Sequence, residues 1–148
     1  MNNLIIKIVN TPEEFTAIQQ IRIKVFQQEQ GVEPALEFDG KDDISTHLIA
    51  YLDNQPIGTT RIRYINEKTA KLERLAVLPE ARGQGIGKQI IEKSLQFLTN
   101  KNISQVVVHS QEYIKNLYVQ LGFIPEGEIF FEAAIPHIKM SKKLVISH

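Results

Sequence analysis

Apolar positions along the chain follow two spacings, and together they predict an alternating order of strands and helices. Runs rich in isoleucine, valine and leucine, bounded by asparagine, glycine or proline, are typical of strands. Apolar residues that recur every three or four positions predict amphipathic helices. The strands are predicted at residues 4–9, 47–53, 57–65, 70–77, 104–110, 123–131 and 137–146, and the helices at residues 11–28, 86–98 and 112–121. The fold class expected from this order is α/β, a single domain over residues 1–148 with a mixed sheet.

The first helix carries a start signal and is followed by a long segment without periodicity. Thr11 is expected to cap the helix, Pro12 suits its first turn, and Glu14 completes a capping box. Residues 29–46 concentrate acidic side chains at Glu29, Glu33, Glu37, Asp39, Asp42 and Asp43. A long loop in a compact domain is often functional, and a solvated acidic loop is the alternative.

Composition narrows the classes of partner and chemistry. The 17 lysines and arginines balance 17 aspartates and glutamates, so we expect no basic surface for nucleic acid or for an anionic membrane. Cysteine is absent, which excludes disulfides, thiolate metal sites and a cysteine acyl-enzyme. The histidines lack metal-ligand spacing, and no apolar run reaches the length of a membrane span. We therefore expect a cytoplasmic protein without a metal, and we leave a homodimer open.

The most informative segment lies at residues 72–98, where a strand leads through a glycine-rich turn into a helix. Glycines at positions 83, 85 and 87 allow positive φ angles and leave no Cβ to block a ligand. The first N–H groups of the helix have no intrahelical partner and carry about half a positive charge, so they attract phosphate. A Walker sequence is excluded because Gln89 follows Gly87 and Lys88, and three antiparallel strands before the turn argue against a Rossmann unit. The turn predicts a phosphate-bearing cofactor held by main chain.

This segment resembles the acetyl-CoA-binding motif of the GNAT superfamily of N-acetyltransferases. The motif Arg/Gln-x-x-Gly-x-Gly/Ala and the preceding Leu-x-Val-x-Pro are matched by Arg82, Gly85, Gly87, Leu75, Val77 and Pro79. A second signature, Tyr-x-x-x-Gly-Phe, is matched by Tyr118, Gly122 and Phe123. The order of elements fits over nearly the whole chain, and residues 25–43 and 133–140 resemble the ElaA-like branch of the superfamily.

The resemblance implies a GNAT fold, in which a mostly antiparallel sheet is flanked by helices and splayed at the cofactor strand. It also implies acetyl-CoA as the cosubstrate, with the pyrophosphate on the turn and the pantetheine arm along the strand before it. The residues assigned to acetyl-CoA on this basis are Leu75, Ala76, Val77, Arg82, Gly83, Gln84, Gly85, Ile86, Gly87, Lys88 and Gln111. At position 111 many family members carry asparagine, and the glutamine here reaches further.

The chemistry implied by the resemblance is direct attack of a bound amine on the thioester, which suits a chain without cysteine. Tyr118 matches the residue that protonates the departing thiolate in many family members. A tyrosine packed in the core is the alternative reading of Tyr118.

A base or a water relay must take a proton from the amine, and Glu73 is the first candidate base. Strand alternation would place Glu73 on the same side as Leu75 and Val77 of the cofactor strand. His109, near the carboxyl end of the central strand, is the reserve base. The alternative for Glu73 is an ion pair with Arg61, Arg63 or Arg74.

The acceptor is expected to be a small-molecule amine, and the acidic segment at residues 29–43 favours a cationic one. Glu29 is the acidic residue expected to reach it because it ends the first helix, and His47 and His109 complete the candidate acceptor contacts. Two other classes remain open at this point. One is a non-catalytic acetyl-CoA-binding regulatory domain, which needs the turn but neither Tyr118 nor a base. The other is an unrelated α/β interaction domain whose turn binds nothing.

Overall fold

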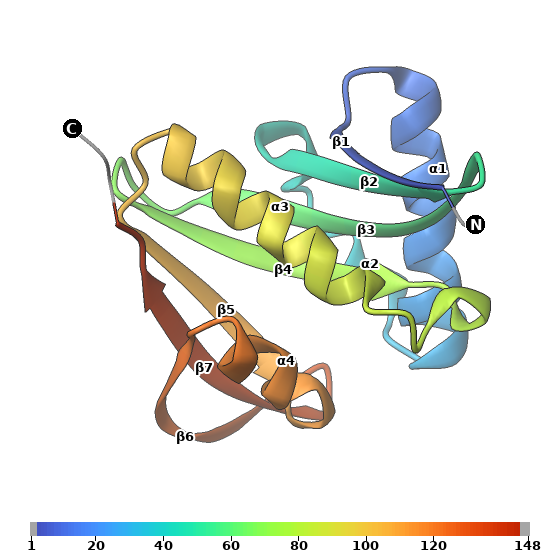
Figure 1. Ribbon diagram of the computed structural model, residues 1–148. Helices are drawn as coiled ribbons and strands as arrows, with labels where there is room; N and C mark the ends of the chain where they lie inside the picture. The colour runs from blue at the N-terminus through green and yellow to red at the C-terminus, as the bar shows by residue number, and fades with distance from the viewer. Residues whose placement is uncertain (1–2, 146–148) are drawn as a thin grey trace.

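The computed structural model describes residues 3–145, which form a seven-stranded sheet with helices on both faces (Figure 1). The strands are β1 (Leu4–Ile8), β2 (Thr46–Leu52), β3 (Gln55–Tyr64), β4 (Thr69–Val77), β5 (Gln105–Gln111), β6 (Ile124–Glu132) and β7 (Ile135–Lys143). The helices are α1 (Pro12–Arg22), α2 (Pro34–Glu37), α3 (Ile86–Asn100) and α4 (Lys115–Gln120), and a π-helix η1 (Ile23–Glu29) continues α1. Single 3-10 turns lie at η2 (Asp42–Ile44), η3 (Pro79–Ala81) and η4 (Glu112–Ile114). The predicted α/β class is confirmed.

The sheet is mixed, with a single parallel pair at its centre. Its strand order is β1-β2-β3-β4-β5-β7-β6, and each neighbouring pair is antiparallel except β4 and β5. Parallel neighbours require a crossover connection, and here α3 provides it. The predicted mostly antiparallel sheet is therefore confirmed.

The parallel pair separates along its length. Pairing of β4 with β5 begins at Thr69 with Gln105 and ends at Leu72 with Val108. Beyond that point β4 continues to Val77 and β5 continues to Gln111 without pairing to each other, and Figure 1 shows the two strands diverging as a V. The predicted splay at the cofactor strand is confirmed, and residues 73–77 have no partner on the β5 side.

A β-bulge at Arg74 changes the direction of the side chains along β4. Glu73 pairs with Arg61 and Val77 pairs with Gly58, so four residue steps on β4 match three on β3, and Arg74 has a φ of +57°. Paired residues point to the same side of a sheet, whereas residues three apart on a strand point to opposite sides. Glu73 and Val77 therefore face opposite sides, and the expectation that they share one is wrong. Bulges also increase local twist, which suits a strand that leaves its neighbour.

Helices α1 and α3 pack on opposite faces of the sheet, as Figure 1 shows. The apolar positions that predicted α3, among them Ile90, Ile91 and Leu98, are fully buried. In β5, Val106 and Val108 lie in the same core cluster as Leu98, as expected for a central strand. The amphipathic spacing of α3 thus anchors the glycine turn at its N-terminus to the middle of the sheet.

The first predicted helix has the expected extent, but its last part is the π-helix η1. Thr11 caps α1, because its Oγ1 accepts the N–H of Glu14 at 3.1 Å. The Glu14 carboxylate accepts the N–H of Asn10 at 3.0 Å, one residue before the cap, so the capping box is shifted. The widened turn is seen where the N–H of Gln30 bonds to the carbonyl of Val25 at 3.1 Å. Such π segments occur frequently at functional sites, and this one ends at Glu29.

Three other predicted segments differ in detail. The acidic loop at residues 29–46 contains α2 and η2, and the predicted helix at residues 112–121 is divided into η4 and α4. Strand β7 begins two residues before the predicted start, and the predicted end at Ile146 lies outside the described residues. Within residues 3–145, no helix is both long enough and apolar enough to cross a membrane.

Candidate active site

The glycine turn has the geometry of an anion cradle. Gly83 and Gly85 have φ angles of +79° and +76°, and Gly85 is the N-cap residue of α3. No side chain caps α3 by a hydrogen bond, so its first backbone N–H groups stay available. A Cβ built on Gly85 would have no protein atom within 4 Å, which leaves open space over the turn. The turn therefore fits the phosphate-binding role predicted from the sequence.

Arg82 and Glu29, predicted as cofactor and acceptor contacts, lie against each other. The Arg82 guanidinium donates to both Glu29 carboxylate oxygens at 2.6 Å, and its Nε donates to the carbonyl of Val77 at 2.9 Å. The hydrogen bonds from Arg82 lower the pKa of Glu29. Glu29 therefore joins the end of η1 to the glycine turn, and it is not among the residues that line the main cavity.

The main cavity, of about 330 Å³, lies in the splay between β4 and β5. Its walls come from η1, α2, β4, β5, η4, α4 and the turn between β6 and β7. Of the predicted site residues, it brings together Glu73, Leu75, His109, Gln111 and Tyr118. Among the polar lining residues, sequence reasoning missed Gln30, Lys71, Arg74, Glu132 and His137. Lys71 is two residues from Glu73 on the same strand, so strand alternation predicts that both side chains lie on one side of the sheet. The positions of Glu132 and His137 depend on long-range strand pairing, which no local pattern encodes.

Tyr118 reaches the cavity from α4 and is almost fully buried, with 4% of its surface exposed. Its ring packs edge-on against Phe123 at 5.4 Å. Burial, with a smaller effect from Tyr113, raises the pKa of the Tyr118 hydroxyl well above its usual range. Among the described residues the hydroxyl has no hydrogen-bond partner, and it carries a proton at neutral pH. This state suits a proton donor.

Glu73, the first candidate base, forms the ion pairs with arginines that were the alternative interpretation of its role. Its Oε1 accepts from Arg61 at 2.9 Å and from Arg63 at 2.7 Å, and its Oε2 lies 3.4 Å from the Lys71 ammonium. Burial opposes ionisation of Glu73, but the Arg63 hydrogen bond and the charges of Arg61 and Lys71 outweigh it and lower its pKa to about 2. A carboxylate with this pKa is a weak base at neutral pH. The catalytic role of Glu73 stays a prediction.

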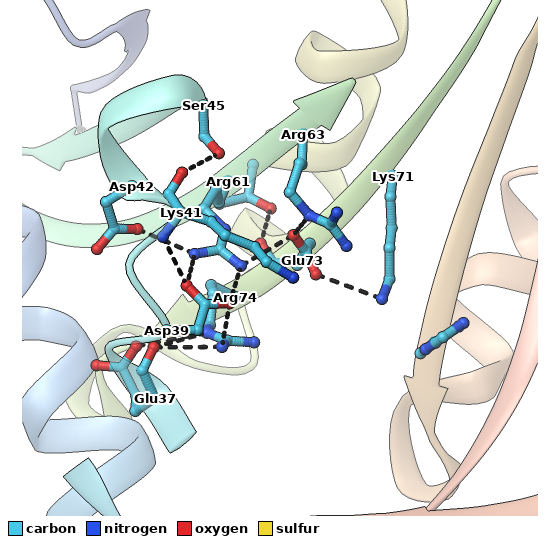
Figure 2. Close-up of polar contacts among 12 residues, drawn as sticks. Glu37, Asp39, Lys41, Asp42, Ser45, Arg61, Arg63, Lys71, Glu73 and Arg74 are labelled. Atoms are coloured by element: carbon cyan, nitrogen blue, oxygen red, sulfur yellow. Dashed lines mark hydrogen bonds and ion pairs between the residues drawn. The ribbon is translucent and has the colours of Figure 1, made fainter. Parts of the chain in front are cut away.

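The acidic segment that was expected to attract a cationic acceptor is bound by arginines instead (Figure 2). Arg22 and Arg61 are both fully buried and share Asp42, at 2.7 and 3.1 Å. Arg22 also pairs with Glu37 at 2.5 Å, and Arg61 pairs with Asp39 at 2.9 Å. Most of the acid in this segment is therefore neutralised within the protein.

Arg74 is the third arginine bound to this segment. It extends from the bulge of β4 to Asp39 at 3.3 Å and to the backbone carbonyls of Leu36 and Glu37. The arginine contacts hold α2 against β4, and so they form one wall of the cavity.

The histidines predicted as acceptor contacts have different positions. His109 lines the cavity, and its Nδ1 lies 2.6 Å from Oε1 of Glu132. The hydrogen bond from His109 is the main cause of a lowered pKa at Glu132. His47 is buried behind α1, where Nε2 donates to the carbonyl of Asp42 at 3.0 Å, and burial lowers its pKa. His47 lines a separate shallow cavity, so the structure does not bring it to Tyr118.

Gln111 ends β5 and contacts the end of η1. Its amide nitrogen donates to the side-chain oxygen of Gln30 at 3.0 Å. Gln111 also lines the cavity, so it lies where the predicted contact with the cofactor requires it. Its amide nitrogen already donates to Gln30. This hydrogen bond joins the end of β5 to the end of η1.

A glycine turn before a helix N-terminus, two splayed strands and a buried tyrosine between them are the features of a CoA-dependent acyltransferase site. The family model of the acetyltransferase (GNAT) domain matches residues 11–144, and the chain belongs to this family of N-acetyltransferases. The YyaT protein of Bacillus subtilis is 34% identical over 94% of this chain and 95% of its own length. ElaA of Escherichia coli is 29% identical over 87% of each chain, which supports the ElaA-like branch.

Solved structures agree with this assignment. The crystal structure of Escherichia coli ElaA covers 93% of this chain and 99% of its own with a TM-score of 0.83 and 25% identity. An acyl-CoA N-acyltransferase from Pseudomonas aeruginosa covers 96% of this chain and 99% of its own with a TM-score of 0.82 and 30% identity. The GNAT fold expected from the sequence is confirmed.

Proposed function

We propose that the protein transfers the acetyl group of acetyl-CoA directly to the amine of a small molecule held in the cavity of the splay. One observation carries this proposal: the edge of β4 that has no β5 partner and the buried Tyr118 line one cavity, and β4 leads on to the glycine turn before α3. Membership in an acetyltransferase family supports the same reaction.

The chain offers a consistent set of contacts for acetyl-CoA. The backbone N–H groups of residues 82–87 suit the pyrophosphate, since Gly85 leaves open space over the turn and α3 has no side-chain cap. Leu75, Ala76 and Val77 lie where β4 has no β5 partner, so their backbone can bond to a pantetheine arm. When bound, acetyl-CoA supplies an activated acetyl group as a thioester. The role of the protein is to orient the two reactants and to move protons.

His109 is the base that the geometry favours over Glu73. When Nδ1–H of His109 donates to Glu132, Nε2 carries a lone pair, and it has no hydrogen-bond partner among the described residues. An alkylamine is mostly protonated at neutral pH, so Nε2 can accept the proton that the amine must lose before attack. Glu132 fixes the ring orientation and stabilises the imidazolium that forms.

Tyr118 completes the reaction as the acid. Attack of the amine nitrogen on the acetyl carbon breaks the bond between carbon and sulfur, and the CoA thiolate that leaves takes the Tyr118 proton. The raised pKa of Tyr118 keeps that proton in place until the thiolate appears.

Thiol release from acetyl-CoA across a panel of small amines tests this function. We expect release that depends on the amine and saturates with acetyl-CoA, together with thermal stabilisation of the protein by CoA alone. Stabilisation by CoA without turnover of any amine would indicate the regulatory, non-catalytic alternative. No stabilisation at millimolar CoA would contradict both readings.

A further inference from the structure

The wall of the cavity along β4 belongs to a charge cluster with more cations than anions. Its members are joined by ion pairs: the cations are Arg22, Arg61, Arg63, Lys71 and Arg74, and the carboxylates are Glu37, Asp39, Asp42 and Glu73. His47 touches the edge of the cluster, but burial lowers its pKa, so it adds no charge at neutral pH. Five cations thus face four carboxylates in these ion pairs, and Glu132, across the splay, also interacts with Lys71 through its charge.

Lys71 and Arg74 are the two cations of the cluster that line the cavity, where they lie beside Glu37 and Glu73. Figure 2 shows Lys71 extending from β4 to a single carboxylate, that of Glu73. The ammonium lies 3.4 Å from Glu73 Oε2, while Arg61 and Arg63 bond to the other oxygen at 2.9 and 2.7 Å. An ammonium has three donors, and Lys71 is only 15% exposed to solvent that could satisfy them.

Arg74 is also incompletely compensated. Burial, followed by the charge of Arg61, lowers its pKa, and its acidic contacts to Glu37 and Asp39 are long, at 3.4 and 3.3 Å. Both cations at the cavity wall therefore have donors available for a ligand. A buried cation that lacks a partner is unfavourable, and an anionic group of a ligand would remove that cost.

The opposite wall has the complementary character. His109 and Glu132 lie across the splay on β5 and β6, and they present the acceptor atoms that an amine needs. The cavity is thus cationic on the β4 side and basic on the β5 and β6 side. A volume of about 330 Å³ is at the lower end of the sites that hold small ligands.

We infer that the acceptor carries a carboxylate as well as its amine, and that it belongs to the class of amino acids. The carboxylate lies against Lys71 and Arg74, and the amine lies against His109 and Glu132. This assignment rests on the proposed acetyltransferase function and replaces the cationic acceptor that the acidic segment had suggested. In that segment Glu37, Asp39 and Asp42 are bound by Arg22, Arg61 and Arg74, so their charge is already neutralised within the protein.

Matched sets of three acceptors test the inference by thiol release. Each set contains an amino acid, its carboxamide and its decarboxylated amine, so that the side chain is constant and only the carboxylate changes. We expect kcat/KM for the amino acid to exceed that for the carboxamide by roughly ten- to a hundredfold, as for the loss of a hydrogen bond to a charged group. The inference is overturned if carboxamides or plain amines are used as well as amino acids. If no amine of any set releases thiol, the proposed function fails instead.

A lysine variant tests whether the preference for the amino acid over its carboxamide depends on the charge of Lys71. A purely structural effect would change the rates with both acceptors alike. Lys71→Met keeps the length of the side chain and removes its charge. We expect it to raise KM for the amino acid, leave the carboxamide unchanged and so abolish the preference within a set. Lys93→Met, on the exposed face of α3, is the matched control and should keep the preference. Equal losses for the amino acid and the carboxamide would assign Lys71 a structural role and contradict the inference.

Discussion

At the scale of single residues, two carboxylates near the cavity have different partners and therefore different roles. Glu73 is bound by Arg61, Arg63 and Lys71, whereas Glu132 is bound by His109 alone among the described residues. A carboxylate held by three cations is a structural anion, and one that orients a histidine supports a base. The local sequence around each carboxylate does not separate these roles, because the partners come from other strands.

The pKa of Glu73 leads to a prediction on acid stability. Its pKa in the folded protein is about 2, below the ordinary glutamate value of 4.5, so ionised Glu73 stabilises the fold above about pH 4.5 and this contribution is lost as pH falls toward 2. The shift corresponds to about 3 kcal/mol. We expect Glu73→Gln to lower the free energy of unfolding at pH 7 by about this amount and to flatten its dependence on pH between 4.5 and 2.

Urea unfolding at a series of pH values measures this effect. Glu92→Gln, on the exposed face of α3 and without an ion pair to any described residue, is the matched control and should keep the wild-type profile. An unchanged slope in Glu73→Gln would show that the cations do not hold Glu73 in its ionised form.

Tyr118 gives a second prediction at this scale. Tyr118→Phe removes the hydroxyl but keeps the ring that packs on Phe123, so the fold and the affinity for CoA should change little. Loss of a general acid typically lowers turnover by about 100- to 10,000-fold. Steady-state thiol release and calorimetric CoA binding separate the two effects. A variant with wild-type turnover would remove Tyr118 as the acid.

At the scale of elements, the glycine turn was readable from sequence because its requirements are local. Positive φ at Gly83 and Gly85 and an uncapped helix N-terminus depend on neighbouring residues only. The bulge at Arg74 and the π-helix η1 could not be predicted from the local sequence, because no glycine or proline marks either of them. Both depend on packing between elements. The wrong side assigned to Glu73 follows directly from the missed bulge.

The two glycines at the start of α3 make a matched test of the cradle. Gly85 has a φ of +76°, so Gly85→Ala should cost about 1 kcal/mol and should turn backbone N–H groups away from the phosphate. Gly87 lies inside the helix, where an added Cβ would meet Leu117, Val77 and Leu75 at ordinary contact distances of 3.7 to 4.0 Å. Gly87→Ala should therefore keep CoA affinity and gain up to about 1 kcal/mol in stability.

Thermal unfolding and calorimetric titration with CoA compare the two variants. Weakened binding in Gly85→Ala alone supports a main-chain cradle at this turn. Equal affinity for CoA in both variants and the wild type would place the pyrophosphate elsewhere.

At the scale of the whole molecule, the order of strands and helices was predictable and the cavity was not. The amphipathic spacing and the turns determine the elements. The resemblance of two motifs to signatures of the superfamily indicates the GNAT fold from the sequence alone. The cavity depends on groups from seven separate segments, including the pair of His109 and Glu132, which are 23 residues apart. The role expected for the acidic segment also changed, because its arginine partners lie on α1, β3 and β4.

The central claim is direct transfer from acetyl-CoA to a small amine, and isotope tracing tests it most directly. Acetyl-CoA with a labelled acetyl group is incubated with the protein and an amino acid acceptor, and both products and the intact protein are analysed by mass spectrometry. The account predicts one labelled N-acetyl product for each thiol released and no change in the mass of the protein. A labelled protein that passes its acetyl group to the amine, or thiol release without an acetylated amine, would contradict it.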